Sequence, residues 1–144
     1  MGRIRVLIAD DHKELLDDIC GLLEPEFEVV GAVGDGQALV SAANIHKPDV
    51  IVTDISMPHL NGIQATRLII QNNPASRVIL ITAHNESALL EQGLSAGALG
   101  YVLKLQLEDE LRQAIHSAMK EKRFISPQVT NRSHANRNLS PPIP

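Results

Sequence analysis

The feature that most constrains this chain is a series of five short apolar runs, spaced along its first 103 residues. Each run is almost continuous in apolar residues, and most of these residues are β-branched. This pattern is typical of strands that are buried on both faces of a parallel sheet. The sequence therefore predicts five strands, at residues 6–9, 29–32, 50–53, 78–81 and 99–103.

Stretches with helical spacing of apolar residues alternate with these runs. Asp35 is placed to cap the second of the five predicted helices, and Pro48 limits the same helix at its other end. Strands that alternate with helices of this length imply right-handed βαβ crossovers. We therefore predict a doubly wound α/β domain with a five-stranded parallel sheet. The apolar helix faces lie within residues 15–23, 38–42, 63–69, 88–94 and 107–119.

The last part of the chain lacks this pattern. We place a single domain at residues 1–122 and a flexible tail or truncated linker at residues 123–144. Docking of residues 124–127 on the domain stays open, whereas residues 130–144 are polar and rich in proline. Residues 1–119 carry 8 Lys/Arg and 16 Asp/Glu, a net charge of −8, and residues 120–144 carry a net charge of +4. An acidic domain argues against direct nucleic acid binding, whose affinity comes largely from neutralised phosphates.

Composition excludes further classes of protein. No apolar run approaches the ~20 residues that span a bilayer, and no signal peptide precedes the first strand, so we expect neither membrane insertion nor secretion. Cys20 is the single cysteine, which rules out an intramolecular disulfide and fits the cytoplasm. Three aromatic residues, Phe27, Tyr101 and Phe124, leave little to stack on a flavin or a nucleobase.

Polar residues follow four of the predicted strands. The first strand is followed by Asp10 and Asp11, the third by Asp54, the fourth by Thr82 and the fifth by Lys104. Sites in open α/β sheets form at the carboxyl ends of the strands, so these side chains should converge on one edge. A single aspartate after a strand is more often a helix cap, but five such residues after four strands indicate a site.

The residue types at this edge indicate phosphoryl chemistry. Three clustered carboxylates repel one another unless a cation is present, and oxygen ligands suit a hard divalent ion such as Mg²⁺. Asp54 is then a candidate nucleophile towards phosphorus, with the metal and Lys104 neutralising phosphoryl oxygens. The hydroxyl of Thr82 is a candidate hydrogen-bond partner for the transferred group.

Four segments, in order along the chain, carry a resemblance to a known family. They are Val6 to His12, Asp54 to Pro58 with Gly62, Leu80 to Ala83, and Ala96 to Lys104. On these segments, residues 3–122 resemble the receiver domain of bacterial two-component response regulators. This resemblance implies a flavodoxin-like fold with strand order 2-1-3-4-5. It also implies a signalling switch rather than an enzyme, with no more activity than self-phosphorylation from small phosphodonors and self-dephosphorylation.

The resemblance assigns a role to each site residue. Asp54 would accept a phosphoryl group from a sensor histidine kinase, and Lys104 would pair with that group. Thr82 would move to bond it, and Tyr101 would rotate inward, which switches the face made by helix four, strand five and helix five. Phosphorylated receivers of this kind often form homodimers. The implied ligands of Mg²⁺ (or Mn²⁺) are Asp11, Asp54 and the backbone carbonyl of Ser56, with Asp10 acting mainly through water.

Two positions near the acceptor are expected to tune the phosphate lifetime. Ser56 lies two residues after Asp54, and His84 lies two residues after Thr82, where water would approach an acyl phosphate. The sequence departs from many receivers at Leu105, where proline with a cis bond is common. A cis peptide before leucine would cost ~3 kcal/mol, so we expect a trans bond.

Residues 122–127 resemble the exit from receivers that carry a LuxR-type helix-turn-helix output domain. No such domain follows in this sequence, so we expect either an excised receiver or one that acts alone through protein contacts. DNA contact would come only through the absent output domain.

Three alternatives remain open at this point. A phosphohydrolase of the haloacid dehalogenase type also uses an aspartyl phosphate with Mg²⁺, but it places a second aspartate where this chain has Ser56. A flavodoxin-like cofactor module shares the fold, yet Asp10 and Asp11 would repel a phosphate without a metal. A pseudo-receiver would only dock partners, although it usually lacks one of the acids or the lysine that this chain keeps.

Overall fold

The computed structural model describes residues 2–85 and 87–129, in which strands and helices alternate. Each of the five predicted strands begins and ends within one residue of its predicted position. The strands are β1 (Arg5–Ala9), β2 (Glu28–Val33), β3 (Val50–Asp54), β4 (Val78–Thr82), β5 (Gly100–Leu103) and β6 (Phe124–Ile125). The helices are α1 (Lys13–Leu23), α2 (Gly36–His46), α3 (Gly62–Asn72), α4 (Ser87–Ser95) and α5 (Leu107–Met119), with the short 3₁₀ helix η1 (Lys104–Gln106) before α5.

All neighbouring strands pair in parallel, in the order β2-β1-β3-β4-β5-β6. The first five strands therefore confirm the predicted order, and β6 adds a short sixth strand. From β1 the chain first moves outward to β2 and then returns past β1 to β3. The reversal leaves a crevice at the carboxyl ends of β1 and β3, which is where ligands bind in sheets of this kind.

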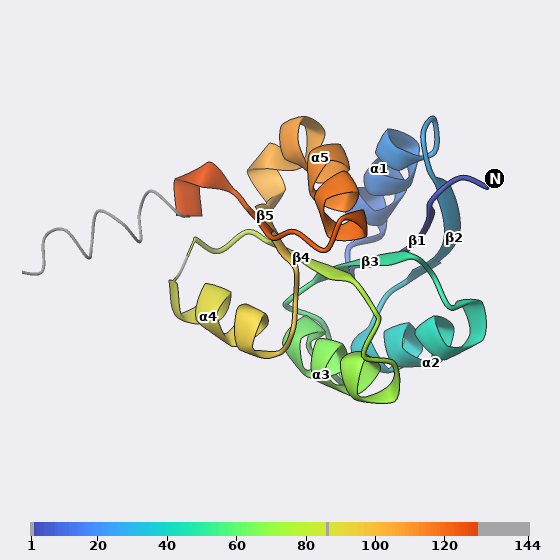
Figure 1. Cartoon of the computed structure of the whole chain (residues 1–144), viewed down its shortest axis with the longest axis horizontal. Coiled ribbons are helices and arrows are strands. Elements are labelled where there is room, and N and C mark those ends of the chain that lie inside the picture. The colour runs from blue at the N-terminus through green and yellow to red at the C-terminus, as the bar shows by residue number, and fades with distance from the viewer. Residues whose placement is uncertain (1, 86, 130–144) are drawn as a thin grey trace, which may run out of the picture.

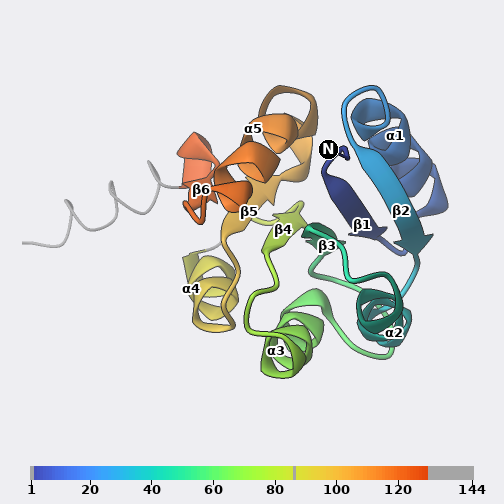
Figure 2. The same ribbon diagram turned by 45° about the vertical axis from the view of Figure 1, so that its right-hand side comes forward.

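Helices cover both faces of the sheet. Helices α1 and α5 lie on one face, and α2, α3 and α4 lie on the other (Figure 1). The turned view shows β2 and β6 at opposite ends of the sheet (Figure 2). The longest helix of the described part of the chain, α5, has 13 residues. None of the helices described is long and apolar enough to cross a membrane.

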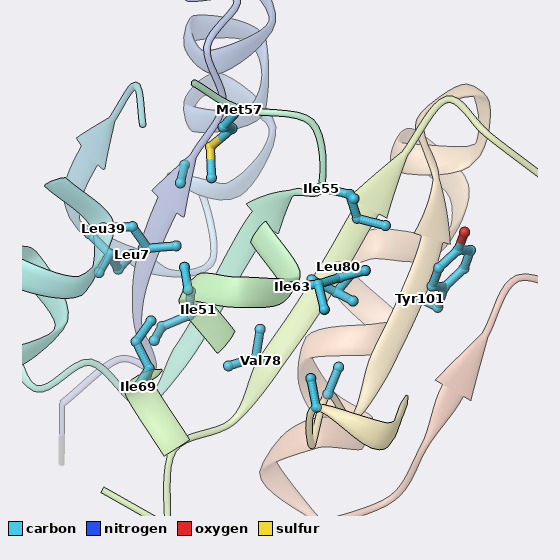
Figure 3. Packing of buried hydrophobic residues seen from close by; sticks show 14 of the residues in the cluster. Leu7, Leu39, Ile51, Ile55, Met57, Ile63, Ile69, Val78, Leu80 and Tyr101 are labelled. Carbon is cyan, nitrogen blue, oxygen red and sulfur yellow. The ribbon is translucent and has the colours of Figure 1, made fainter. Parts of the chain in front are cut away.

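Alternate residues of the strands supply two hydrophobic cores. On one face, Leu7, Ile51 and Leu80 pack with Leu39 of α2 and Ile63 of α3 (Figure 3). The strand residues between them point to the opposite face, where α1 and α5 complete the second core. That core includes Val6, Ile8, Val52, Ile79, Ile81, Ile19, Leu111 and Ile115.

Local sequence signals fix the helix starts beside the crevice. The Asp35 side chain accepts a hydrogen bond from the N–H of Ala38 at 2.8 Å, which confirms the predicted cap of α2. Helix α3 begins with a capping box, in which Asn61 and Gln64 each accept the backbone N–H of the other. Two of the orphan donors at the start of α3 are satisfied in this way.

Strand β2 differs from the prediction that the strands are buried on both faces. Glu28 and Ala32 are exposed, and the other residues of β2 are only partly buried. The reason is the position of β2 at the edge of the sheet, where it has a neighbouring strand, β1, on one side only. The central strands β3 and β4 are fully buried, as predicted.

The fold continues past residue 122, where we predicted the end of the domain. Phe124–Ile125 forms β6 against β5, and Ser126 and Val129 are buried, with 0% and 1% of their surface exposed. Residues 124–129, which the sequence placed in a flexible tail, are therefore folded. The rest of the predicted tail, residues 130–144, lies outside the described residues.

Candidate functional site

The polar residues that were predicted to converge lie at one edge of the sheet. Strands β3 and β4 end at Asp54 and Thr82, and Asp10 and Lys104 directly follow β1 and β5. The parallel register keeps the carboxyl ends of these four strands level. The site is thus a direct consequence of the topology, because each strand delivers one polar side chain to the same edge.

Three carboxylates and one imidazole form a compact cluster there. Asp10, Asp11, His12 and Asp54 each offer one ligand atom, and these atoms lie within 4.8 Å of one another. Asp10 and Asp54 are buried, whereas Asp11 and His12 are exposed. The cluster therefore has a buried wall and a side that is open to solvent. The backbone N–H of His12 donates to Asp10 Oδ1 at 2.8 Å, which fixes the buried carboxylate.

Lys104 connects the two buried carboxylates. Its Nζ lies 3.0 Å from Asp10 Oδ2 and 3.2 Å from Asp54 Oδ2. The Lys104 side chain is 17% exposed, and those of Asp10 and Asp54 are 0% and 4% exposed. One ammonium thus neutralises part of the charge of two buried acids, and a net negative charge remains in the site.

The protonation equilibria of the site reflect this balance. Burial raises the pKa of Asp54 and the neighbouring Asp10 adds to the rise, so the pKa stays above its ordinary value although Lys104 lowers it. Burial lowers the pKa of Lys104, but the two carboxylates together raise it more, and the net pKa is raised. Lys104 is therefore a firmly held positive charge, and Asp54 is a more basic carboxylate than an exposed aspartate.

The donor set suits a hard divalent cation. Asp10 Oδ2 is buried, and the Lys104 ammonium that lies 3.0 Å from it also serves Asp54. Two buried carboxylates and the exposed Asp11 thus share this ammonium, and a cation in the cluster would offset the negative charge that remains. Oxygen ligands from carboxylates are those that Mg²⁺ prefers. The residues present therefore fit the predicted ion.

The loop after β3 is held close to Asp54. The backbone N–H of Ser56 lies 3.4 Å from Asp54 Oδ1, and the N–H of Gly62 donates to the carbonyl of Ile55 at 2.8 Å. A Cβ atom at Gly62 would lie only 2.0 Å from the backbone oxygen of Asp54. Glycine at this position lets the start of α3 pack directly against the end of β3. The role of the Ser56 carbonyl as a metal ligand stays a prediction.

The loop after β4 is fixed by hydrogen bonds from two strands. The N–H of His84 donates to the buried Thr82 Oγ1 at 3.0 Å, and the hydroxyl of Tyr101 donates to the His84 carbonyl at 3.2 Å. Tyr101 is 1% exposed and belongs to the same core as Leu80 of β4 (Figure 3). Hydrogen bonds therefore link His84, a predicted lifetime residue, to both Thr82 and Tyr101, two of the predicted switch residues. Their predicted movements stay predictions.

His12 is the member of the cluster that sequence reasoning did not assign to it. Its Nδ1 lies 3.3 Å from Asp10 Oδ1 and 3.2 Å from Asp11 Oδ1. The available signal was its position directly after the two acids. Leu105, the residue directly after Lys104, is 94% exposed. No cis peptide bond occurs in residues 2–85 or 87–129, which confirms the trans bond predicted before Leu105.

Comparison with known sequences gives a consistent family match. A family model described as the response regulator receiver domain matches residues 6–116. The transcriptional regulatory protein DegU of Brevibacillus brevis is 37% identical over 132 residues, which cover 90% of this chain and 56% of DegU. The chain thus spans little more than half the length of this relative.

Solved structures with the same fold belong to the same group of proteins. A LuxR-family two-component response regulator from Aurantimonas sp. SI85-9A1 has a TM-score of 0.89 and 32% identity, covering 95% of this chain and 99% of that one. The isolated receiver (REC) domain of RcsB from Salmonella enterica serovar Typhimurium, in the presence of the phosphomimetic BeF₃⁻, has a TM-score of 0.82 and 31% identity, with coverages of 90% and 98%. Another similar structure holds two RcsB dimers bound to two parallel DNAs, with a TM-score of 0.82, 31% identity and coverages of 90% and 67%.

Proposed function

The chain belongs to the response regulator receiver family, and from this premise we propose that transfer of a phosphoryl group to Asp54 switches it. It is a receiver domain of a two-component system, a signalling switch rather than an enzyme. The observation that carries the proposal is the buried arrangement of Asp10, Lys104 and Asp54, with one ammonium 3.0 Å and 3.2 Å from the two carboxylates.

In the proposed transfer, an oxygen of the Asp54 carboxylate forms a bond to phosphorus as the bond from phosphorus to the donor breaks. The donor's bonding electron pair leaves with it, so a phosphohistidine becomes a neutral imidazole and Asp54 becomes an acyl phosphate. Burial and the raised pKa of Asp54 both favour nucleophilic attack, because the carboxylate is poorly hydrated and basic. Lys104 is placed to neutralise charge on the phosphoryl oxygens.

Asp10, Asp11, Asp54 and the Ser56 carbonyl would hold Mg²⁺, or Mn²⁺, at the acidic cluster. When bound, such an ion supplies positive charge to the phosphoryl oxygens and thereby lowers the barrier to transfer. Asp10 and Asp54 form the buried wall of this site, and the exposed Asp11 lies on its solvent side. The negative charge that Lys104 alone does not neutralise supports this assignment.

The same proposal gives Thr82 and Tyr101 the task of transmitting the change. A phosphoryl group on Asp54 would offer an acceptor to the Thr82 hydroxyl, which now accepts the N–H of His84. A shift of Thr82 would pull on His84, whose carbonyl is bonded to Tyr101. The face made by α4, β5 and α5 would respond, because two conformations of this chain of contacts differ in how well they bind the phosphoryl group.

Ser56 and His84 are proposed to set the lifetime of the acyl phosphate. Both are exposed and lie two residues beyond a buried site residue. Replacement His84→Ala is expected to change the rate at which phosphate is lost from Asp54, measured by intact mass over time. His46→Ala, at the end of α2, is the matched control and should leave the rate unchanged. An unchanged decay in His84→Ala would remove His84 from this role.

We further propose that the phosphodonor is a sensor histidine kinase and that phosphorylation favours a homodimer in the cytoplasm. RcsB, a similar protein, is found as dimers on DNA. The acidic charge of residues 1–119 supports DNA contact through another domain rather than through this one. We place the end of the receiver domain after Val129, which is buried, and assign residues 130–144 to a tail or linker.

Intact mass spectrometry after incubation with acetyl phosphate and Mg²⁺ tests the proposal. We expect one added phosphate on the native chain and none on Asp54→Asn. Asp18→Asn, which changes an exposed aspartate of α1, serves as the matched control and should be phosphorylated normally. If Asp54→Asn is modified like the native chain, Asp54 is not the acceptor. If folded native chain takes up neither phosphate nor beryllofluoride, the receiver function gives way to docking without phosphorylation.

A further inference from the structure

The segment that leaves the domain is bonded along the outer edge of β5, directly before Lys104. We call residues 124–129 the exit segment. The N–H of Phe124 donates to the Leu99 carbonyl at 3.0 Å, and the N–H of Ser126 donates to the Tyr101 carbonyl at 2.9 Å. Val129, at the end of the exit segment, is buried in the core that also holds Tyr101. The exit segment therefore follows β5 to the point where the strand reaches the site.

Ser126 makes the last of these contacts with its side chain. Its Oγ accepts the backbone N–H of Leu103 at 3.0 Å and donates to Glu110 Oε1 of α5 at 2.5 Å. Ser126 is 0% exposed and Glu110 is 9% exposed. Leu103 is the residue before Lys104, so a single buried hydroxyl joins α5, the exit segment and the backbone from which Lys104 extends.

Burying the Glu110 carboxylate and the Ser126 hydroxyl has a desolvation cost that an apolar pair at these positions would avoid. A buried carboxylate needs hydrogen bonds, and Glu110 receives one from Ser126. The N–H of Leu103 would also lose its partner if the hydroxyl were absent, since β6 has only two residues and ends before this position. The hydroxyl therefore satisfies a donor and an acceptor that come from two different elements.

We propose that Ser126, held by Glu110, is a positioning residue for Lys104 and couples the exit segment to the phosphorylation of Asp54. The inference rests on the function proposed above. Lys104 contacts Asp54 directly, and any displacement of Lys104 on phosphorylation reaches Ser126 through the Leu103 N–H. Tyr101 provides a second connection, because its hydroxyl bonds the His84 carbonyl and its own carbonyl accepts the Ser126 N–H.

The positioning role is tested by the rate of phosphorylation from acetyl phosphate, followed by intact mass on the full chain. We expect Ser126→Ala to lower the rate about tenfold, since small displacements of a charged group cost large factors in rate. Ser126→Thr keeps the hydroxyl and should recover most of the rate. Thr66→Ala is the matched control, because it removes another buried hydroxyl, one that donates to Gly62 in α3. Thr66→Ala should react at close to the native rate.

The coupling is tested by hydrogen–deuterium exchange with and without beryllofluoride and Mg²⁺. In the native chain we expect the exchange rate of the exit segment to change by at least about threefold when beryllofluoride and Mg²⁺ are added. Exchange in peptides around Asp54 should change as well. In Ser126→Ala, the peptides around Asp54 should still respond while the exit segment no longer does. The Thr66→Ala control should behave as the native chain does.

The outcomes separate this inference from the function on which it rests. If the native peptides around Asp54 respond but the exit segment does not, the coupling is refuted while the receiver function stands. If Ser126→Ala reacts at the native rate, or Ser126→Thr fails to recover a lost rate, Ser126 does not position Lys104. If nothing in the native chain responds and Asp54 takes up no phosphate, both proposals fail. The measurement on the native chain decides the coupling even if Ser126→Ala does not fold.

Discussion

Replacing Lys104 with methionine is expected to destabilise the fold by about 3 kcal/mol near neutral pH. At an effective dielectric constant of about 20, each of its contacts, at 3.0 Å and 3.2 Å, corresponds to about 5 kcal/mol of attraction. Much of this gain offsets the cost of burying the ammonium itself. The variant loses both attractions and leaves two buried carboxylates, Asp10 and Asp54, whose ligand atoms lie within 4.8 Å. Methionine keeps the apolar part of the side chain, so the loss reports on charge.

The loss of unfolding free energy in Lys104→Met should become smaller as the solution is made more acidic. Lys104 lowers the pKa of Asp54, while burial, the larger effect, raises it. Without the ammonium the pKa rises further, and Asp54 takes up its proton at a higher pH than in the native chain. A protonated carboxyl needs no positive partner, so the difference in unfolding free energy between native chain and variant falls as pH drops towards about 4.

Urea unfolding in the presence of a chelator, near neutral pH and again near pH 5, measures both effects. Lys13→Met is the matched control, because Lys13 and its partner Asp17 are 4.0 Å apart, with side chains 88% and 68% exposed. That control should change the unfolding free energy by less than about 0.5 kcal/mol. The reasoning is refuted if Lys104→Met is as stable as the native chain near neutral pH, or if its deficit grows on acidification.

Two further changes test the packing and charge of the site. The raised pKa of Asp54 means that stability is lost as pH rises from the ordinary value of 3.8 through the folded value. Asp54→Asn should therefore have a higher unfolding free energy than the native chain near neutral pH. The difference should disappear at acid pH, where Asp54 is protonated, and a difference that does not vary with pH would contradict this. Gly62→Ala should cost about 3 kcal/mol in thermal or urea unfolding, since its Cβ would lie 2.0 Å from the Asp54 oxygen. Gly21→Ala in α1, whose Cβ meets nothing within 4 Å, should instead gain about 0.5–1 kcal/mol.

The central part of the fold could be predicted because parallel strands carry a strong sequence signal. Strands β3 and β4 are covered on both faces, so their residues are apolar almost without interruption. The same signal predicted the bounds of β2 correctly, but its prediction that β2 is buried on both faces was wrong. Whether a strand lies at the edge depends on the order of the whole sheet. Strand β6 has two residues, which is too short for any periodicity to be visible.

The candidate site divides in a similar way. Asp10, Asp54 and Lys104 could be brought together from the sequence, since parallel strands place their ends at one edge whatever the details of packing. The bond from Ser126 to Glu110 could not, because it joins residues 16 positions apart through a turn and a short strand. Neither residue type nor spacing distinguishes this pair from polar residues on a solvated surface.

The exit segment also determines what the far edge of the sheet offers to other molecules. An exposed strand edge is a row of unpaired N–H and C=O groups that can template aggregation with a second chain. Here the carbonyls of Leu99 and Tyr101 and the N–H of Leu103 are all taken by residues 124–126. A receiver cut before Phe124 would expose these backbone groups, and we expect it to self-associate through β5. The few residues after α5 therefore protect the edge of the sheet from pairing with a strand of another chain.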